Sequence, residues 1–294
     1  MTRQVFVVGA GRCGTRSVSD LLSGVPGCRV VHERQPQLLD EVTAFLEGGR
    51  SSEAMVELLR TTRAPFADGE RLSGEANQRL SYVLPALVDA FPDLRLVWLI
   101  RDGRDAVTSM HHRLWYDPHE AERRPGAVRA WAANRIRGDV VGDVSAEEWD
   151  RLDPFGRCCW YWSHTNRLIE REIQRLAVPA LRVRIECLRE TLPALWSFLD
   201  LAGPVPGHIP RANRASGGRP LSWHFWSRGQ CETFHARCAS VMDRHYAGWR
   251  EEMPAYTARR EVLARVARGL WRFRSFSVST TRPLRTRVGL ARSR

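Results

Sequence analysis

The chain has 294 residues, of which 43% are apolar, and it carries a formal net charge of +12 at pH 7. The apolar fraction is enough for the core of one large domain, and no apolar run reaches the roughly 18 residues that a membrane-spanning helix needs. Since the N-terminus also lacks a charged and apolar leader, we expect a cytoplasmic location. The seven cysteines form no Cys-x-x-Cys pair and no Cys/His spacing suited to zinc, so we expect reduced thiols and no metal site.

A glycine-rich segment follows the first apolar run of the chain. The run Val5–Val8 leads into Gly9–Ser17, and apolar residues then recur at helical spacing at Val18, Leu21 and Leu22. This pattern is typical of a strand, a tight turn and a helix. Unpaired N–H groups at such a helix N-terminus favour a phosphate or a similar tetrahedral anion. The segment therefore predicts an anionic ligand.

The basic residues of this loop narrow the choice of anion. All 45 basic residues of the chain are arginine, so the loop lacks the lysine with which nucleoside triphosphatases reach the outer phosphates. Arg12 and Arg16 lie within the turn itself. Because each adds a planar cationic fork to the backbone donors, they favour a heavily charged group.

The glycine spacing supports a second hypothesis. Gly9, Gly11 and Gly14 match the G-x-G-x-x-G pattern, and Glu33 follows a short apolar strand at 28–31. Glycines and an acid at this spacing are typical of dinucleotide binding. An NAD(P)-dependent oxidoreductase is therefore an alternative.

Strands and helices alternate along the rest of the chain. Apolar runs predict further strands at 94–100 and 180–185. Apolar residues at helical spacing predict helices at 36–47, 52–62, 79–91, 104–112, 127–137, 157–176 and 188–201. We expect a single-domain α/β fold with a P-loop-like parallel sheet and helices on both faces, over residues 1–255. A basic amphipathic helix and an Arg-rich tail are expected over 256–294.

The strand at 94–100 runs directly into a second polar motif. Arg101 lies at the strand end, and Ser109 lies eight residues further, two helical turns into the next helix. An arginine at the carboxyl end of a parallel strand can bind a phosphate outside the sheet. Two separate anion-binding motifs are therefore predicted.

With both motifs in view, the chain resembles the PAPS-dependent sulfotransferases, and among them the bacterial and carbohydrate-type branch. The donor of this family is 3'-phosphoadenosine 5'-phosphosulfate (PAPS), and the eight-residue Arg/Ser spacing matches its 3'-phosphate motif. The resemblance extends to Gly74–Asn77 and to a helix at 155–172. It implies that Arg101 and Ser109 bind the 3'-phosphate. The residues that it implies for the 5'-phosphosulfate are Arg12, Cys13, Gly14, Thr15, Arg16 and Ser17.

The resemblance also implies transfer of a sulfuryl group to a hydroxyl of a carbohydrate or specialised metabolite, in line and without a metal. It places the catalytic carboxylate at Glu33, and His32 is the competing candidate. Because consecutive strand residues point to opposite faces, we expect one of the two to face the donor. Arg12 is expected to stabilise charge on the sulfuryl and leaving oxygens. Glu75 and Asn77 are interpreted either as partners that support the site or as a simple turn.

Later segments suggest contacts to both substrates and to a surface. A late basic loop closes over the donor in the family, which implies Arg214 and Arg219 as further donor ligands. The irregular segment 113–154, rich in charge and Trp, is expected to form part of the acceptor pocket or its lid. The basic helix at 258–273 either packs on the core or contacts an anionic membrane surface. No nucleic-acid partner is expected, although a basic membrane- or nucleic-acid-binding protein is the non-enzymatic alternative.

Overall fold

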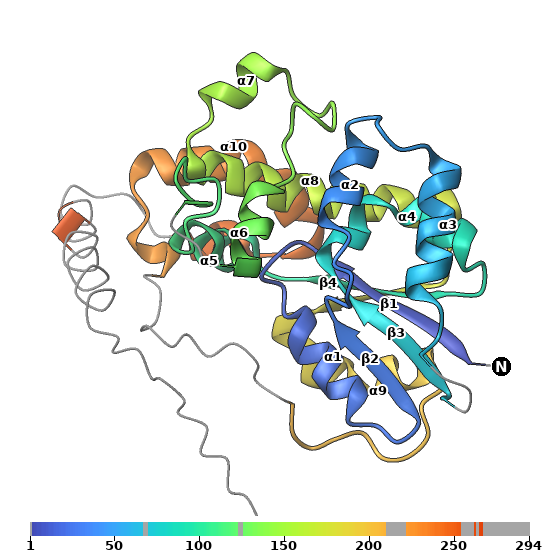
Figure 1. The fold of residues 1–294 in the computed structure, drawn as a ribbon. Helices are drawn as coiled ribbons and strands as arrows, with labels where there is room; N and C mark the ends of the chain where they lie inside the picture. The colour runs from blue at the N-terminus through green and yellow to red at the C-terminus, as the bar shows by residue number, and fades with distance from the viewer. Residues whose placement is uncertain are drawn as a thin grey trace, which may run out of the picture.

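A computed structural model describes residues 2–66, 70–122, 126–209 and 222–253, together with 262, 265 and 266, and Figure 1 shows its fold. Within these residues five parallel strands form one sheet in the order β2-β3-β1-β4-β5. The strands are β1 (Arg3–Gly9), β2 (Cys28–His32), β3 (Leu72–Ala76), β4 (Arg95–Ile100) and β5 (Ala180–Arg184). The predicted α/β fold with a parallel sheet is confirmed.

Helices cover both faces of this sheet, as predicted. Figure 1 shows α1 and α9 on one face and α3, α4 and α8 on the other. No helix among the described residues is long and apolar enough to cross a membrane. The helices are α1 (Thr15–Ser23), α2 (Leu39–Leu46), α3 (Ser52–Arg63), α4 (Leu84–Ala90), α5 (Gly103–His112), α6 (Gly126–Ala133), α7 (Ala146–Arg151), α8 (Pro154–Leu176), α9 (Leu188–Leu199), α10 (Arg228–His245) and α11 (Trp249–Glu252), with 3-10 turns η1 (Gln78–Tyr82), η2 (Ile185–Cys187) and η3 (Trp223–Phe225).

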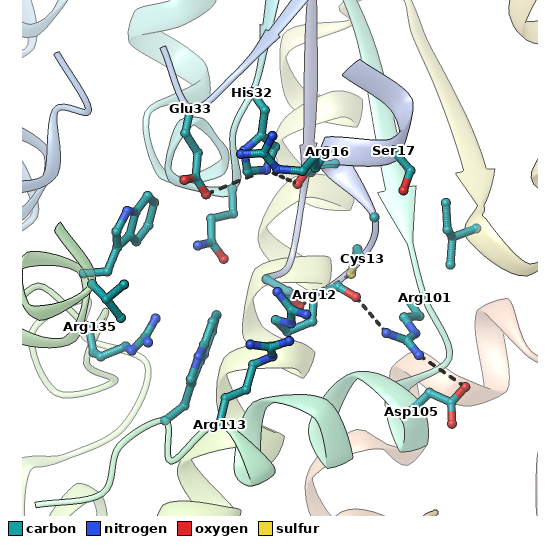
Figure 2. Close-up of a pocket in the computed structure, with 18 of the residues that line it drawn as sticks. Arg12, Cys13, Arg16, Ser17, His32, Glu33, Arg101, Asp105, Arg113 and Arg135 are labelled. Carbon is teal, nitrogen blue, oxygen red and sulfur yellow. Dashed lines mark hydrogen bonds and ion pairs between the residues drawn. The ribbon is translucent and has the colours of Figure 1, made fainter. Parts of the chain in front are cut away.

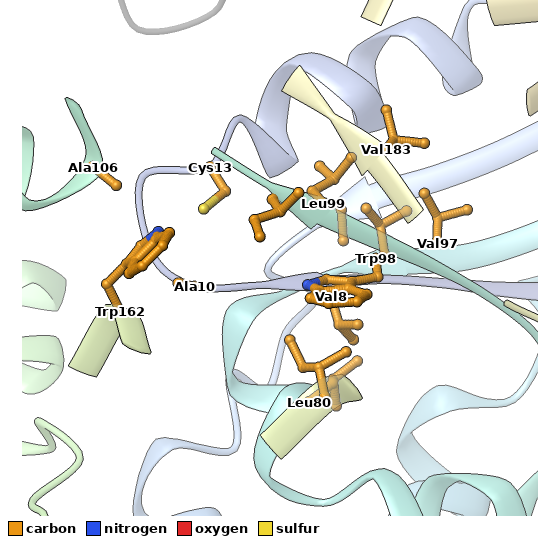
Figure 3. Close-up of a cluster of buried hydrophobic side chains, with 14 of the residues drawn as sticks. Val8, Ala10, Cys13, Leu80, Val97, Trp98, Leu99, Ala106, Trp162 and Val183 are labelled. Atoms are coloured by element: carbon orange, nitrogen blue, oxygen red, sulfur yellow. The ribbon is translucent and has the colours of Figure 1, made fainter. Parts of the chain in front are cut away.

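The core lies around the central strands and reaches the glycine-rich loop. Val5–Val8 of β1 and most of β4 are buried, as parallel strands covered on both faces should be. Figure 3 shows that the side chains of Ala10 and Cys13 lie at the same end of this core as Trp162 of α8. The Trp162 indole N–H also donates a hydrogen bond to the Arg101 carbonyl, at 3.0 Å. One buried helix therefore supports the chain where both predicted motifs leave the sheet.

The interior strand β3, which lies between β2 and β1, is not predicted from the sequence. Its residues Leu-Ser-Gly-Glu-Ala are all buried, yet they contain neither an apolar run nor an alternating pattern. The strand is possible because its polar side chains find partners inside the protein, Ser73 with the Phe66 N–H at 3.2 Å and Glu75 as described below. Gly74 is required by close approach, since a Cβ there would lie 1.8 Å from the Val5 carbonyl oxygen.

Most predicted helices are shifted by a few residues at one end, and three of the differences have a local physical reason. The helix predicted at 36–47 begins only at Leu39, because Leu38 adopts a left-handed conformation with φ of 55°. The helix predicted at 79–91 is divided into η1 and α4, since Pro85 lies in the first turn of α4, where its missing N–H is tolerated. The helix predicted at 127–137 ends at Ala133, and the Asn134 side chain donates to the Ala130 carbonyl at its end.

Candidate active site

A cavity of about 480 Å³ lies at the carboxyl end of the sheet. Every strand delivers residues to it. The glycine-rich loop follows β1, His32 and Glu33 lie at the end of β2, Gln78 follows β3, Arg101 follows β4, and Ile185 follows β5. Ligands of open parallel sheets bind in this position, outside the carboxyl ends of the strands. The cavity is therefore the candidate active site.

The loop brings the N-terminus of α1 to the cavity. Gly14 adopts a left-handed conformation with φ of 92°, and among the described residues no side chain caps the helix there. A Cβ at Gly14 would lie 2.8 Å from the Ile185 side chain. Gly14, Thr15, Arg16 and Ser17 all line the cavity. The first N–H groups of α1 are therefore placed to receive an anion.

Protein side chains hold the first part of this loop. The Gly9 N–H donates to Ser81 Oγ and the Gly11 N–H donates to the Tyr161 hydroxyl, each at 3.3 Å. The Tyr161 hydroxyl in turn donates to the side-chain oxygen of Gln78 at 3.1 Å. Because Tyr161 belongs to the buried helix α8, the loop is fixed to the core before any ligand arrives.

Arg12 lies deep in the cavity wall and connects the two motifs. Its Nε donates to Ser109 Oγ at 3.2 Å, and the Arg101 Nη1 donates to the Arg12 carbonyl at 3.1 Å. Burial, with Arg113 and Arg101 nearby, lowers the pKa of Arg12 to about 10, so its guanidinium stays charged at neutral pH. Arg101 itself lines the cavity and lies 3.6 Å from Asp105.

His32 and Glu33 both line the cavity, so the expectation that one of them would face away is wrong. The reason is backbone geometry: Glu33 has a φ of 52°, which breaks the alternation of the strand. This left-handed conformation costs a non-glycine residue about 1 kcal/mol or more. His32 Nε2 lies 3.8 Å from Glu33 Oε1 and is hydrogen-bonded with Thr15 Oγ1 at 3.1 Å.

The electrostatics distinguish these two neighbours. Burial lowers the pKa of His32 to about 4, with Arg16 and Arg12 contributing, so the imidazole is neutral at pH 7. Burial raises the pKa of the Glu33 carboxyl, and the nearby arginines oppose that effect. A carboxylate with a raised pKa is the stronger base of the two at neutral pH. Glu33 is therefore better suited to accept a proton.

Cys13 contributes its backbone to the loop, while its side chain lies in the core. The thiol is fully buried and points toward the Gly11 carbonyl, with Sγ 3.9 Å from the oxygen. Burial raises the pKa of Cys13 to about 12, so the residue stays a thiol. Any contact with a bound anion would come from its main chain.

The cavity is also lined by an aromatic wall, which we define as Trp115 and Trp131, together with Val128, Arg113 and Arg135. Arg135 forms a bidentate ion pair with the buried Glu120, and its guanidinium lies 3.7 Å from the centre of the Trp115 ring. Figure 2 shows Glu33 and Arg135 toward one end of the cavity, Arg101 and Asp105 toward the other, and Arg12 between them. Arginine and carboxylate side chains therefore lie at both ends of the cavity.

No family model matches this chain, and no curated protein matches it. Solved structures that it resembles include a sulfotransferase domain from the curacin biosynthetic pathway, at 14% identity and a TM-score of 0.42 over 69% of this chain and 76% of that one. A sulfotransferase domain from the Synechococcus PCC 7002 olefin synthase has 16% identity and a TM-score of 0.41, over 69% and 75% of the two chains. A Mycobacterium avium sulfotransferase has 15% identity and a TM-score of 0.42, over 83% and 69%.

Most of the predicted site residues meet in the one cavity. Those that line it are Arg12, Cys13, Gly14, Thr15, Arg16, Ser17, His32, Glu33 and Arg101. Ser109 is hydrogen-bonded to Arg12 and is not among the lining residues. Arg214 and Arg219 lie outside the described residues, as does most of the predicted helix at 258–273. The described residues contain no cluster of ligands suited to a metal ion.

Sequence reasoning did not single out the individual residues of segment 113–154 that line the cavity. Segment 113–154 is predicted as part of the acceptor pocket or its lid, and Arg113, Trp115, Glu120, Trp131 and Arg135 do line the cavity. The available signal was the density of Trp and Arg in an irregular segment. That signal identifies a segment, whereas the inward-facing side chains depend on how it folds over the sheet.

Proposed function

We propose that this protein is a sulfotransferase that moves a sulfuryl group from PAPS to a hydroxyl of a carbohydrate or specialised metabolite. One observation carries the proposal. Three arginines from two separate motifs, Arg12, Arg16 and Arg101, line the same cavity as the uncapped N-terminus of α1 and the Glu33 carboxylate. Such a cavity suits a donor with a charged group at each end and an acceptor whose proton must be removed.

The residues present fit this donor. The N–H groups at the start of α1, with Arg16, are suited to the 5'-phosphosulfate, and Arg101 lies at the cavity end where a second phosphate would bind. Ser109 Oγ accepts the hydrogen bond from Arg12 Nε, which leaves its own O–H able to donate to a donor oxygen. Bound PAPS supplies an activated sulfuryl group whose leaving group is a phosphate.

The chain's own residues would then do three things. Glu33 accepts the proton of the acceptor hydroxyl as its oxygen bonds to sulfur and the bond from sulfur to the phosphate oxygen breaks. Arg12 and Arg16 stabilise the negative charge that moves onto the leaving phosphate. The aromatic wall holds the acceptor beside Glu33, since indole faces pack well on sugar rings and on planar molecules.

The topology argues against the NAD(P)-dependent alternative. In a dinucleotide-binding sheet, the strand that carries the ribose-binding acid pairs directly with the strand that carries the glycine loop. Here β3 lies between β1 and β2, so the strand ending at Glu33 is about 10 Å from β1. The glycine spacing is therefore present without the strand order that usually accompanies it.

The test is calorimetric titration with adenosine 3',5'-bisphosphate, the product of PAPS. Separate titrations with NADH and NADPH test the alternative hypothesis of an oxidoreductase. We expect the bisphosphate alone to bind, and we expect Arg16→Ala to weaken it. Arg151→Ala is the matched control, because Arg151 is exposed and pairs with Glu147 outside the cavity. Binding of a nicotinamide dinucleotide in place of the bisphosphate would refute the proposal.

Three further elements of the proposal rest on the sequence alone. The first is contact of Arg214 and Arg219 with the donor. The second is the boundary between the α/β domain at 1–255 and the C-terminal segment at 256–294. The third is contact of the helix at 258–273 with an anionic membrane surface. Truncation after Tyr256 tests the last two together. We expect the truncated chain to bind the bisphosphate and to lose association with vesicles that contain an anionic lipid.

A further inference from the structure

A buried ion pair lies behind Glu33 and outside the cavity. Arg63 at the end of α3 and Glu75 in β3 are joined by Arg63 Nε and Glu75 Oε2 at 2.7 Å, and each side chain is only 1% exposed. Removing two charges from water is unfavourable unless they are paired and further hydrogen-bonded. The other groups that hydrogen-bond to these two side chains therefore matter for the stability of the pair.

The two side chains contact the backbone that follows Glu33. Glu75 Oε1 accepts hydrogen bonds from the Arg34 N–H at 2.9 Å and from the Asn77 side chain at 2.8 Å. Arg63 Nη2 donates to the carbonyls of Pro36 at 2.7 Å and Arg34 at 3.2 Å. The pair thus forms hydrogen bonds with both the backbone N–H and the backbone carbonyl of Arg34, the residue directly after Glu33.

Glu33 itself is fixed from its other side by the sheet. Its N–H donates to the Ala76 carbonyl at 3.1 Å, which is the last rung between β2 and β3. Between that rung and the held peptide of Arg34, the backbone of Glu33 has the left-handed φ of 52°. Such a conformation persists only where the surroundings determine it strongly. Glu75 and the Ala76 carbonyl belong to the same strand, so one rigid element supports both sides.

We propose that the Arg63–Glu75 pair positions Glu33, by holding the peptide of Arg34 so that the Glu33 carboxylate turns into the cavity beside His32. Arg63 and Glu75 are positioning residues in this view, since neither lines the cavity. The inference rests on the proposed function only where it names Glu33 as the base. The placement of Glu33 by the pair holds whatever the cavity binds.

Charge provides a readout of this coupling. The groups that act on the Glu33 carboxyl are Arg16, Arg12 and Arg135, which lower its pKa, and Glu75, which raises it. His32 stays neutral beside it, because its own pKa is lowered to about 4. Replacing Glu75 by Gln removes a negative charge and leaves Arg63 unneutralised. Both changes favour the ionised form of Glu33.

The first experiment follows the Glu33 carboxyl by carbon-13 NMR in protein labelled at the glutamate side chains, with Glu33→Gln to assign the signal. We expect its pKa to fall in Glu75→Gln. Glu172→Gln is the matched control, because Glu172 is a buried, arginine-paired carboxylate of α8 that does not line the cavity. An unchanged Glu33 titration in Glu75→Gln would overturn the proposal.

The second experiment separates positioning from general stability, and it also covers the case in which Glu75→Gln fails to fold. Arg63→Lys keeps the charge but lacks the fork that reaches both Glu75 and the two carbonyls. In Arg63→Lys we expect the rate of sulfate release from radiolabelled PAPS, with water as the acceptor, to be about a hundredfold lower than in the wild-type protein. Bisphosphate affinity should stay within about twofold, because no donor-binding residue changes.

The same substitution is then made in the Glu33→Gln background. If Arg63 acts through Glu33, it should cause no further loss there, since the group that it positions is already gone. An equal loss in both backgrounds would mean that Arg63 merely stabilises the fold. Failure of the bisphosphate to bind the wild-type protein would count against the proposed function alone, because the titration of the Glu33 carboxyl does not depend on what the cavity binds.

Discussion

Arg101 and Asp105 should change donor affinity in opposite directions when each is neutralised. The two side chains lie 3.6 Å apart at one end of the cavity, and both line it. A charge-assisted hydrogen bond contributes about 1.5 to 3 kcal/mol. Because the Arg101 side chain is 31% exposed, the lower figure applies. Arg101→Ala should therefore weaken bisphosphate binding about tenfold.

Asp105→Asn should strengthen the same binding. In the free protein the Asp105 carboxylate is the ion-pair partner of Arg101, and it would also repel a bound phosphate. A partly exposed pair contributes about 0.2 to 1 kcal/mol, so its removal should raise affinity about twofold. Asn keeps the size of the side chain, which makes the comparison one of charge.

Calorimetric titration with adenosine 3',5'-bisphosphate measures both effects, at low and at physiological salt. Salt should reduce the difference between the variants, since it screens exposed charges. Thermal unfolding of Arg101→Ala is a necessary control, because Arg101 also donates to the Arg12 carbonyl and so supports the loop. Weaker binding by Asp105→Asn, or unchanged binding by a folded Arg101→Ala, would refute the assignment of this end to a phosphate.

Three other predictions follow from the same structure. Glu33→Gln should lower turnover by about a hundredfold or more and leave bisphosphate affinity unchanged, as measured by sulfuryl transfer and calorimetry; full turnover would move the base role to His32. Since the base must be ionised and the pKa of Glu33 is raised above the ordinary value of 4.5, activity should be lost as pH falls through that raised value, and a pH–rate profile with the limb of an ordinary glutamate would contradict this. Gly74→Ala should prevent folding, because its Cβ would lie 1.8 Å from the Val5 carbonyl oxygen; a normal unfolding temperature by circular dichroism would show that β3 can move.

The parts of the fold that the sequence predicts are those with apolar runs or a glycine-rich turn. Val5–Val8 and 94–100 are recognisable as strands because both faces of each are buried. β3 has the same environment, but it reaches it with Ser73, Gly74 and Glu75, which depend on specific partners such as Val5 and Arg34 in other segments. Local patterns carry no information about such partners.

The same distinction applies to the site. Arg12, Arg16 and Arg101 were predictable because each lies at a fixed place after a strand or within a turn. The joint exposure of His32 and Glu33 to the cavity was not, since it depends on one left-handed residue that the strand pattern cannot reveal. The role of Arg63 could not be predicted either, because it arises only when the end of α3 meets Glu75 of β3.

The glycine-rich loop has two parts, an anchor at Gly9–Gly11 that is bonded to the core, and a receptor at 12–17 that faces the cavity. The amides of Gly9 and Gly11 are already bonded to Ser81 and Tyr161, so an incoming anion meets donors only from Arg12 onward. The anchor tolerates little change, since a Cβ at Gly9 would lie 2.3 Å from the Leu99 carbonyl oxygen. Within the receptor, Cys13 is fully buried and a Cβ at Gly14 would lie 2.8 Å from the Ile185 side chain, whereas Thr15, Arg16 and Ser17 line the cavity at the start of α1. Related sequences could therefore exchange one bound anion for another by substitutions in 15–17, while the attachment of the loop to the sheet stays the same.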